Sequence, residues 1–590
     1  MLFEASWEIC NKVGGIYTVV KSKIRPTQER YGENYFLFGP YFPKKVQGEF
    51  EEKVPRDFLR QPFDTVRKEG IVCHFGNWLV PGNPNTILID FSNYAVQKNS
   101  IKTMYWEEYK IDSMNTEYFD YDEPMVWSTA VGRVIEEIMK ELKDKKAVAH
   151  LHEWLAGGAL LHLASRKVKI GTVFTTHATM LGRTLASHNI NLYSELKSID
   201  PEKAAYTYKV ATKFQTERAC AQHASVFTTV SEITGMEAEH FFSRKPDILL
   251  LNGLDLTKFP TFEESTIKHR AFRTHIREFL MYYFFPYYSF NLQETLIYFI
   301  CGRYEFHDKG IDILIKALGK LNEQLKKEKS SRNVVCFFWI PGNIKGIKPE
   351  LLESKTYYND VKDSLDDSME DIKNRLVFRT IADEKISTET LFDHELVQEI
   401  KRKVLKLKRN GSPGLCTHDL YDEGNDAILN ALKKERLLNK KDDKVRVVYY
   451  PIYLTGADGM LDLGYYESMQ GSHLGIFPSV YEPWGYTPLE SGALGVPAIT
   501  TDLAGFGRYI SGHINEEAPG IFVLHRFNKT DDEATEELAG ILLNFAKLTK
   551  QKRVQNKIEA KNLAATADWK KFIELYITAH NMAIERAYSK

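Results

Sequence analysis

The sequence predicts an α/β fold in at least two large domains. Short apolar runs recur along the chain, and each ends in small, polar or histidine residues where a helix is expected to begin. This alternation is typical of α/β units with parallel strands. A chain of 590 residues is too long for one hydrophobic core. The pattern starts again at about residue 296, so we expect a second α/β unit there.

Composition excludes several classes of function. The chain is 43% hydrophobic and 27% charged, as in ordinary soluble globular proteins. A formal net charge of −1 argues against a nucleic-acid groove or a surface for anionic membranes. Six dispersed cysteines without a Cys-x-x-Cys pair argue against structural zinc and a disulfide framework, and favour a reducing cytosol. The N-terminus lacks signal-peptide features, and no apolar run approaches the roughly 18 residues of a membrane helix.

The first half opens with a pair of glycines, Gly14-Gly15, before an expected helix. Such a turn lets backbone amides approach a phosphate, although many ordinary turns carry the same pair. Strands are then expected at residues 35–38, at the start of 147–165, and at 173–176, 226–230 and 248–251. His150, His152 and Glu153 lie in one of these units. No third ligand has a fixed spacing to the histidine pair, so a metal site is not expected.

In the second half, the loop after the strand at 296–301 carries two cations, Arg303 and Lys309. An arginine binds two phosphate oxygens and a lysine adds a point charge, so this strand-to-helix loop suits a diphosphate. A pair of surface charges is the alternative. Further strands are expected at 334–340 and 445–450. Between them, residues 345–440 are charged and helical, which predicts a helical insertion for assembly rather than catalysis.

The rest of the chain is organised around residues 475–507, which predict a strand, a loop, a helix and a strand. Thr487 at N-cap, Pro488 at N1 and Glu490 at N3 indicate the helix start. Glu482 and Glu490 then flank a helix N-terminus at the C-terminal end of a parallel strand. Ligands bind there in open α/β sheets, and the free amides favour a phosphate. Each carboxylate has a simpler alternative: Glu490 closes a capping box, and Glu482 is a solvated loop charge.

The last part, from residue 532 on, is expected to be helical. Four basic residues spaced 3, 4 and 4 apart share one helix face there: Lys550, Arg553, Lys557 and Lys561. A solvated face is the simpler interpretation, and an anion site is the alternative.

Five motifs occur in order along nearly the whole chain. They are Lys12-Val13-Gly14-Gly15, His152-Glu153-Trp154, Thr176-His177-Ala178-Thr179, Gly302-Arg303-Tyr304-Glu305-Phe306 and Tyr481-Glu482-Pro483-Trp484-Gly485-Tyr486-Thr487-Pro488. Together they resemble the motifs of eukaryotic glycogen synthases, the animal and fungal type. The resemblance implies a GT-B fold of two Rossmann-like domains facing across a cleft. The expected divisions are 1–270, 271–565 with the oligomerisation insertion at 345–440, and a last helix, about 566–590, that crosses back.

The resemblance also implies the activity. The expected activity is that of a retaining glycosyltransferase that moves glucose from UDP-glucose to the 4-hydroxyl of an α-1,4-glucan end, with no metal or cofactor. Expected partners are the glycogen acceptor, a glycogenin-like primer protein and three further copies in a homotetramer. An oxocarbenium-like transition state is expected, with the acceptor attacking from the face that UDP leaves and the leaving phosphate taking the proton. A covalent intermediate on Glu482 is the alternative. Closure of the domains would exclude water.

Individual roles follow from the same resemblance. The implied catalytic residues are Glu482, Arg303, Lys309 and His177. The implied substrate-binding residues are Lys12, Gly14, Gly15, Glu153, Arg183, Asn252, Tyr465, Trp484, Gly485, Tyr486, Thr487 and Glu490. Among these, Tyr465 stacks on uracil and Glu490 holds the ribose, while Arg303 and Lys309 hold the diphosphate.

The chain departs from the animal and fungal pattern in two ways. Those proteins carry terminal extensions with phosphorylation sites, whereas this chain starts at the first strand and stops at Lys590. Their arginine-rich glucose 6-phosphate helix is here mostly lysine, with Glu559 at a usual arginine position, and a usual Phe-Gln-Asn-x-His motif reads differently at 262–266. Because lysine cannot bind phosphate bidentately, weak or absent activation by glucose 6-phosphate is expected. Two rival functions remain: a starch-synthase-like transferase using ADP-glucose, and a non-catalytic glucan- or glycogenin-binding scaffold.

Overall fold

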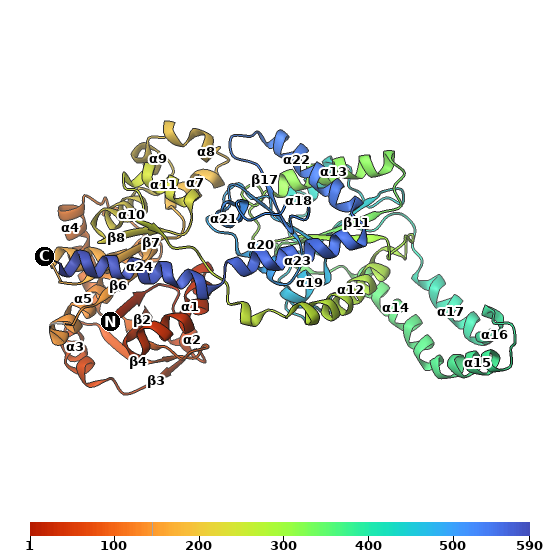
Figure 1. Cartoon of the computed structure of the whole chain (residues 1–590), viewed down its shortest axis with the longest axis horizontal. Coiled ribbons are helices and arrows are strands. Elements are labelled where there is room, and N and C mark those ends of the chain that lie inside the picture. Colours follow the sequence, from red (N-terminus) through yellow and green to blue (C-terminus); the bar gives the residue numbers. More distant parts are fainter. Residues whose placement is uncertain (144, 590) are drawn as a thin grey trace.

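The computed structural model of the chain describes residues 1–143 and 145–589, and it has two α/β lobes (Figure 1). Residue 144, and residue 590 at the end of the predicted last helix, lie outside the described residues. The lobes lie next to each other along the long axis, and a helical arm projects from the second lobe. Among the described residues no helix is both long and apolar enough to cross a membrane. The predicted α/β class is confirmed.

The first lobe is built on a sheet that has nine strands within the described residues. In spatial order they are β3 (Phe50–Glu52), β4 (Val72–Trp78), β5 (Asn85–Asp90), β2 (Tyr35–Pro40), β1 (Leu2–Ala5), β6 (Val148–His152), β7 (Gly171–Thr176), β8 (Val226–Thr229) and β9 (Ile248–Leu249). The pairs β3–β4 and β4–β5 are antiparallel and the other pairs are parallel. Sequence reasoning identified β2 and β6–β9 but not the antiparallel edge.

Helices cover both faces of this sheet. They are α1 (Gly15–Tyr31), α2 (Pro43–Val46), α3 (Asp57–Arg67), α4 (Lys98–Tyr109), α5 (Glu123–Leu142), α6 (Glu153–Ser165), α7 (Met180–Ser187), α8 (Leu192–Glu195), α9 (Pro201–Thr207), α10 (Ala211–His223) and α11 (Glu232–Phe242). The C-terminal helix α24 (Trp569–Tyr588) returns from the second lobe and packs against β7 and α1 (Figure 1). The prediction that the last helix crosses back agrees with this packing.

The second lobe has a parallel sheet of six strands within the described residues. In spatial order they are β14 (Val445–Tyr449), β11 (Asn333–Trp339), β10 (Thr295–Cys301), β15 (Leu474–Ile476), β16 (Ala498–Thr501) and β17 (Ile521–Leu524). Every residue of β10 and β11 is buried, which explains why these strands are continuous apolar runs in the sequence. Sequence reasoning identified all of them except β17.

The helices of this lobe are α12 (Phe262–Phe284), α13 (Ile311–Lys327), α18 (Ala427–Lys434), α19 (Tyr465–Gly471), α20 (Tyr486–Ala493), α21 (Gly505–Ser511), α22 (Asp531–Lys547) and α23 (Lys550–Thr566). Helix α12 runs through the predicted domain boundary at 270/271 without a break, and it packs against α19. The linker between the lobes therefore precedes α12.

The predicted insertion forms the projecting arm, which is shorter than expected. It contains α14 (Pro349–Asp367), α15 (Met369–Ile381), α16 (Thr388–Leu391) and α17 (His394–Leu407). No residue of α15, α16 or α17 is buried. After α17 the chain returns to the lobe, because β13 (His418–Leu420) pairs with β12 (Ile344–Ile347) at the base of the arm and α18 packs on α13.

Each sheet has a point at which the strand order reverses. In the first sheet it lies between β1 and β6, and in the second between β10 and β15. Loops from the two strands diverge at such a point and leave a crevice beyond their carboxyl ends, where open α/β sheets bind ligands.

Candidate functional site

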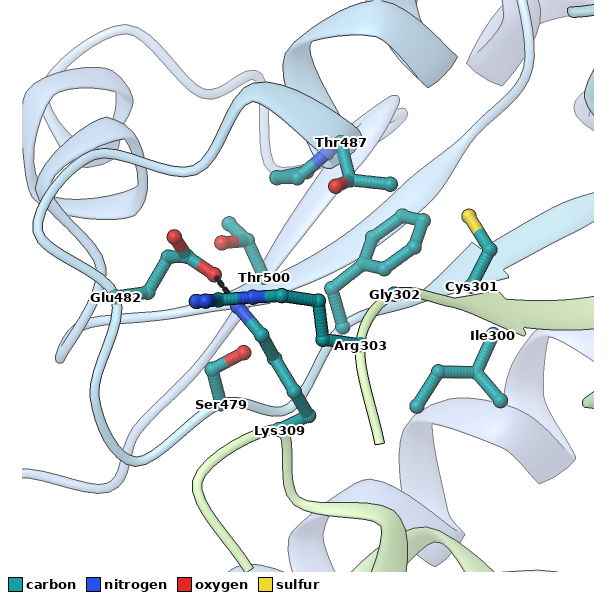
Figure 2. Close-up of a pocket in the computed structure, with 11 residues that line it drawn as sticks. Ile300, Cys301, Gly302, Arg303, Lys309, Ser479, Glu482, Thr487 and Thr500 are labelled. Carbon is teal, nitrogen blue, oxygen red and sulfur yellow. Dashed lines mark hydrogen bonds and ion pairs between the residues drawn. The ribbon is translucent and has the colours of Figure 1, made fainter. Parts of the chain in front are cut away.

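A cavity of about 210 Å³ lies at the reversal point of the second sheet (Figure 2). Its walls come from the ends of β10, β15 and β16 and from the start of α20: Ile300, Cys301, Gly302, Arg303, Lys309, Phe477, Ser479, Glu482, Thr487, Pro488 and Thr500. Three of the four predicted catalytic residues, Arg303, Lys309 and Glu482, therefore lie together. The volume suits part of a nucleotide sugar rather than all of it.

The charges in this cavity are accessible to a ligand. Lys309 Nζ donates to Glu482 Oε2 at 2.6 Å, and the dashed line in Figure 2 marks this ion pair. The Arg303 side chain is 68% exposed, and its Nη2 lies 3.0 Å from Glu305 Oε1. The side chains of Arg303 and Lys309 both reach toward Glu482 (Figure 2). Two cations thus converge on one carboxylate beside a helix N-terminus.

Helix α20 starts differently from the prediction. Its N-cap is Gly485 rather than Thr487, and Gly485 has a φ of 110°, in the left-handed region that favours glycine. The predicted helix start at Thr487 is therefore wrong, and the alternative in which Glu490 closes a capping box is excluded. Glu490 Oε1 accepts a hydrogen bond from Tyr466 at 2.7 Å, and its Oε2 accepts one from Tyr465 at 3.1 Å. Burial raises the pKa of the Glu490 carboxyl to about 7.

Of the remaining predicted residues of the second lobe, some lie beside the cavity and others lie away from it. Tyr465 is half-buried beside the cavity, with its hydroxyl 3.9 Å from Cys301 Sγ. Tyr486 donates to the carbonyl of Gly253 in the first half of the chain at 3.2 Å. The Trp484 ring is buried against Phe506 on α21 and Phe572 on α24, so it belongs to the hydrophobic core between these helices and not to the cavity wall.

The reversal point of the first sheet holds a buried polar network. Glu4 on β1 accepts from Lys23 and from His152 Nε2, the latter at 2.6 Å. His152 Nδ1 lies 2.9 Å from His177 Nε2. Burial lowers the pKa of His177 well below its usual value, with the charges of His152 and Lys23 adding to this. The ring is therefore neutral at neutral pH.

Glu153 organises the loop that carries His177. It begins α6 with a φ of 65°, a strained value for a residue with a side chain, and its Oε1 accepts from the amides of His177 and Ala178 at 2.8 and 3.0 Å. Burial raises the pKa of the Glu153 carboxyl to about 7. Burial lowers the pKa of the Arg183 guanidinium, but Tyr481 and Glu153 outweigh it and raise this pKa above its usual value.

Backbone amides of the glycine loop at the start of α1 already donate hydrogen bonds to a side chain of the protein. Glu8 Oε2 accepts from the amides of Gly14 and Tyr17 at 2.9 and 2.8 Å. Gly15 follows as the first residue of α1, and the exposed Lys12 lies before it. Asn252 is buried, with its Oδ1 3.5 Å from the hydroxyl of Tyr576 on α24. A phosphate at this loop would compete with Glu8 for the amides.

One side chain of the second lobe reaches directly into the first. The Tyr481 hydroxyl lies 3.3 Å from Glu237 Oε2 and 3.4 Å from the carbonyl oxygen of Thr179. Because Tyr481 precedes Glu482 in the chain, this contact ties the position of the cavity carboxylate to the first lobe. Sequence reasoning missed Glu237, Thr179 as a partner and Tyr466, since no local pattern indicates contacts over such separations.

A metal interpretation of the first-lobe network is disfavoured by its hydrogen bonds. Ligand atoms of Glu4, His150 and His152 lie within 4.8 Å of one another. Both ring nitrogens of His150 are engaged, by His580 at 3.1 Å and by Thr175 at 2.8 Å. The Lys23 ammonium on Glu4 also opposes a dication.

The basic residues on one face of α23 differ in their exposure and in their hydrogen bonds. Lys561 donates to the carbonyls of Pro260 and Ala493, whereas Lys550 is exposed. Burial, together with the charges of Arg273 and Arg553, lowers the pKa of the Lys557 ammonium to about 7. Arg273, His269 and His473 add to this cluster from α12 and the α19–β15 turn, and sequence reasoning missed all three because they are distant in sequence from α23.

Comparisons with known proteins show that this chain is similar in sequence to glycogen synthases. A sequence model described as glycogen synthase matches residues 4–590. Liver glycogen [starch] synthase of Mus musculus is 35% identical over 590 residues, covering 100% of this chain and 84% of that protein. Glycogen [starch] synthase of Neurospora crassa is 34% identical over 594 residues, covering 100% and 84%. The enzyme of Caenorhabditis elegans is 34% identical over 599 residues, covering 100% and 88%.

The solved structures to which this chain is similar are more distant in sequence. The catalytic domain of starch synthase IV from Arabidopsis thaliana, bound to ADP and acarbose, has a TM-score of 0.48 and 13% identity, covering 98% of this chain and 99% of that one. An E. coli structure described as trehalose-6-phosphate bound with UDP-2-fluoro glucose has a TM-score of 0.49 and 9% identity, covering 99% and 98%.

Proposed function

This chain belongs to the glycogen synthase family, and we propose that it is a retaining GT-B enzyme that transfers glucosyl units from UDP-glucose to glycogen. The observation that carries the proposal is the meeting of Arg303, Lys309 and the N-terminus of α20 beside Glu482. A diphosphate leaving group there would be neutralised by two cations and by backbone amides. No metal is needed for that task.

Each group in the cavity has a distinct part in the proposed reaction. Arg303 and Lys309 hold the diphosphate, and Glu482 lies where positive charge develops on the sugar ring. The bond from the sugar C1 to the phosphate oxygen breaks while the acceptor 4-hydroxyl attacks from the same face. The hydroxyl proton passes to the leaving phosphate oxygen. Glu490, with Tyr465 and Tyr466, would accept the ribose hydroxyls.

Competition between donors tests the proposal. UDP-glucose and ADP-glucose are offered together with a glucan acceptor, and the released nucleotides are quantified. We expect UDP to predominate. Predominant ADP release would support the starch-synthase-like rival, and binding of glucan without release of either nucleotide would support the scaffold rival.

We propose that the arm formed by α14–α17 assembles the chain into a homotetramer. Its outer helices carry six exposed apolar side chains: Met369, Leu376, Val377, Phe378, Ile381 and Leu405. Such side chains on a projecting arm are suited to burial against further copies. Replacing residues 369–407 by a short Gly-Ser linker should convert the tetramer to a smaller species in sedimentation velocity. A monomeric intact chain at micromolar concentration would refute this.

Weak or absent activation by glucose 6-phosphate stays a prediction. The cluster around Lys557 could take a phosphate, but Lys557 is half neutral near pH 7. Any stimulation should therefore be greater at pH 6 than at pH 8, because the ammonium form is restored below pH 7. Strong stimulation that does not change with pH would contradict it. A glycogenin-like primer partner and a cytoplasmic location are also proposed. The six free cysteines support the latter, and a tagged chain would test both by affinity capture and imaging.

A further inference from the structure

A buried chain of hydrogen bonds ends at His177, in the loop whose Thr179 carbonyl oxygen lies 3.4 Å from the Tyr481 hydroxyl of the second lobe. It runs from Lys23 through Glu4 and His152 to His177. Glu4, His152 and His177 lie on or directly after three neighbouring strands, β1, β6 and β7, at the point where the strand order reverses. All four side chains are buried, and His177 is the most exposed of them at 8%.

The direction of the hydrogen bonds is fixed by the anionic end. Burial opposes ionisation of Glu4, but Lys23 and His152 hold the pKa of its carboxyl well below the usual value. An ionised carboxylate only accepts hydrogen bonds, so His152 Nε2 must donate. The His152 ring is neutral, since burial lowers its pKa, and its Nδ1 is then an acceptor. His177 Nε2 must therefore donate to His152.

This leaves one nitrogen of His177 with a lone pair. Within residues 1–143 and 145–589, Nδ1 of His177 has no hydrogen-bond partner, and it is not one of the buried polar atoms left without one, so it is open to solvent. The Arg183 charge acts on this ring, and Arg183 in turn interacts with Glu305 and Tyr481 of the second lobe. The free nitrogen therefore borders the space between the lobes.

We propose that Glu4 and His152 are positioning residues that hold His177 in the tautomer whose Nδ1 accepts a hydrogen bond from a hydroxyl of the donor glucosyl group. The proposal rests on the transferase function proposed above. Glu153 fixes the backbone of His177 by accepting a hydrogen bond from the His177 amide, and the chain of hydrogen bonds fixes the His177 ring. A site prepared as an acceptor discriminates against a sugar that lacks the matching hydroxyl.

His150 supplies a matched control. It lies two residues from His152 on the same strand, is equally buried, and also makes two hydrogen bonds. Its partners are His580 and Thr175, and it has no hydrogen bond to His177. His152→Gln and His150→Gln thus remove the same kind of buried ring, and only the first interrupts the path to His177.

The test measures kcat/KM for UDP-glucose and for the 2-, 3-, 4- and 6-deoxy donors in both variants and in the unaltered enzyme. In the unaltered enzyme, loss of the contacted hydroxyl should cost about 10-fold. In His152→Gln that one ratio should fall toward 1 while the other ratios hold, and His150→Gln should keep all of them. Glu4→Gln, which retains the side-chain length, should shift the same ratio if His152→Gln does not fold.

Two results would overturn the proposal: variants of His152 and Glu4 that retain every ratio, or a shift of the same ratio in His150→Gln. Failure of the unaltered enzyme to transfer from UDP-glucose would instead refute the proposed function. The two failures are therefore distinguishable.

Discussion

The two lobes place polar groups at equivalent points of their sheets but treat them in opposite ways. At the reversal point of the first sheet, Glu4, His152 and His177 are buried and each is held by a protein partner. At that of the second sheet, Arg303 is mostly exposed and Lys309 pairs with Glu482. The first arrangement fixes orientation, and the second leaves charge available for a ligand.

This contrast indicates a division of labour. Buried groups that are held by protein partners cannot rearrange easily, so the first lobe is suited to hold a sugar in one orientation. The desolvation free energy of the exposed cations in the unliganded protein is small, so the second lobe is suited to attract and neutralise a diphosphate. Substitutions in the second lobe should therefore cost more activity than stability.

The largest effect is expected for Glu482→Gln. This substitution keeps the size of the side chain and removes the negative charge beside Lys309, so glucan elongation should fall about 10³-fold while the unfolding temperature changes little. Elongation from UDP-glucose and thermal unfolding are the measurements. Glu305→Gln is the control, because it removes a carboxylate of the same region that pairs with the exposed Arg303. Equal losses in both variants would remove the special role of Glu482.

A smaller effect is expected for Arg303→Lys. The charge stays but the planar two-pronged donor is lost, so kcat/KM for UDP-glucose should fall about 10- to 100-fold. Lys316→Gln on α13, a cation that pairs with the exposed Asp532, should leave the activity unchanged. A neutral result for Arg303→Lys would show that the cavity needs only a point charge there, and the contrast between the lobes would be weaker.

The two lobes also differ in how far their sites could be predicted from the sequence. Arg303, Lys309 and Glu482 lie directly after buried strands, so local patterns indicated their common edge. The network of the first lobe was not predictable in this way, because Glu4 and His152 are 148 residues apart in the chain. Only the strand order, which depends on tertiary packing, brings them together.

Local rules failed where tertiary contacts replaced them. The motif around Thr487 has every feature of a capping box, but two tyrosines of α19 bind Glu490 instead and the helix begins at Tyr486. The aromatic Trp484 was expected near the substrate because of its neighbours, and it packs under α24. Both outcomes depend on elements distant in sequence.

A moderate pH effect is expected from Glu490. Burial raises the pKa of its carboxyl to about 7, so the ionised form that accepts ribose hydroxyls is lost as pH falls through that value. The KM for UDP-glucose should therefore rise about threefold between pH 7.5 and pH 6.5. Glu490→Gln should have a higher KM that does not change over this range. A pH-independent KM in the unaltered enzyme would mean that this carboxyl does not contact the donor.

The smallest effect is expected where the two lobes meet. Tyr481→Phe removes a hydroxyl that lies 3.3 Å from Glu237, with hardly any change in shape. Glu237 keeps its bonds from Thr179 and Tyr193, at 2.6 and 2.7 Å, and the lost contact is long, so the loss should be about 0.5 kcal/mol, or roughly twofold in kcat. The matched control is Tyr193→Phe, which removes a donor from the same carboxylate but lies within the first lobe. If Tyr481 aligns Glu482 with the first lobe, Tyr481→Phe should lower kcat more than Tyr193→Phe does, at equal or smaller cost in unfolding temperature. The reverse order would mean that the contact only stabilises the buried carboxylate, and that the exposed charges of the second lobe need no alignment by the first.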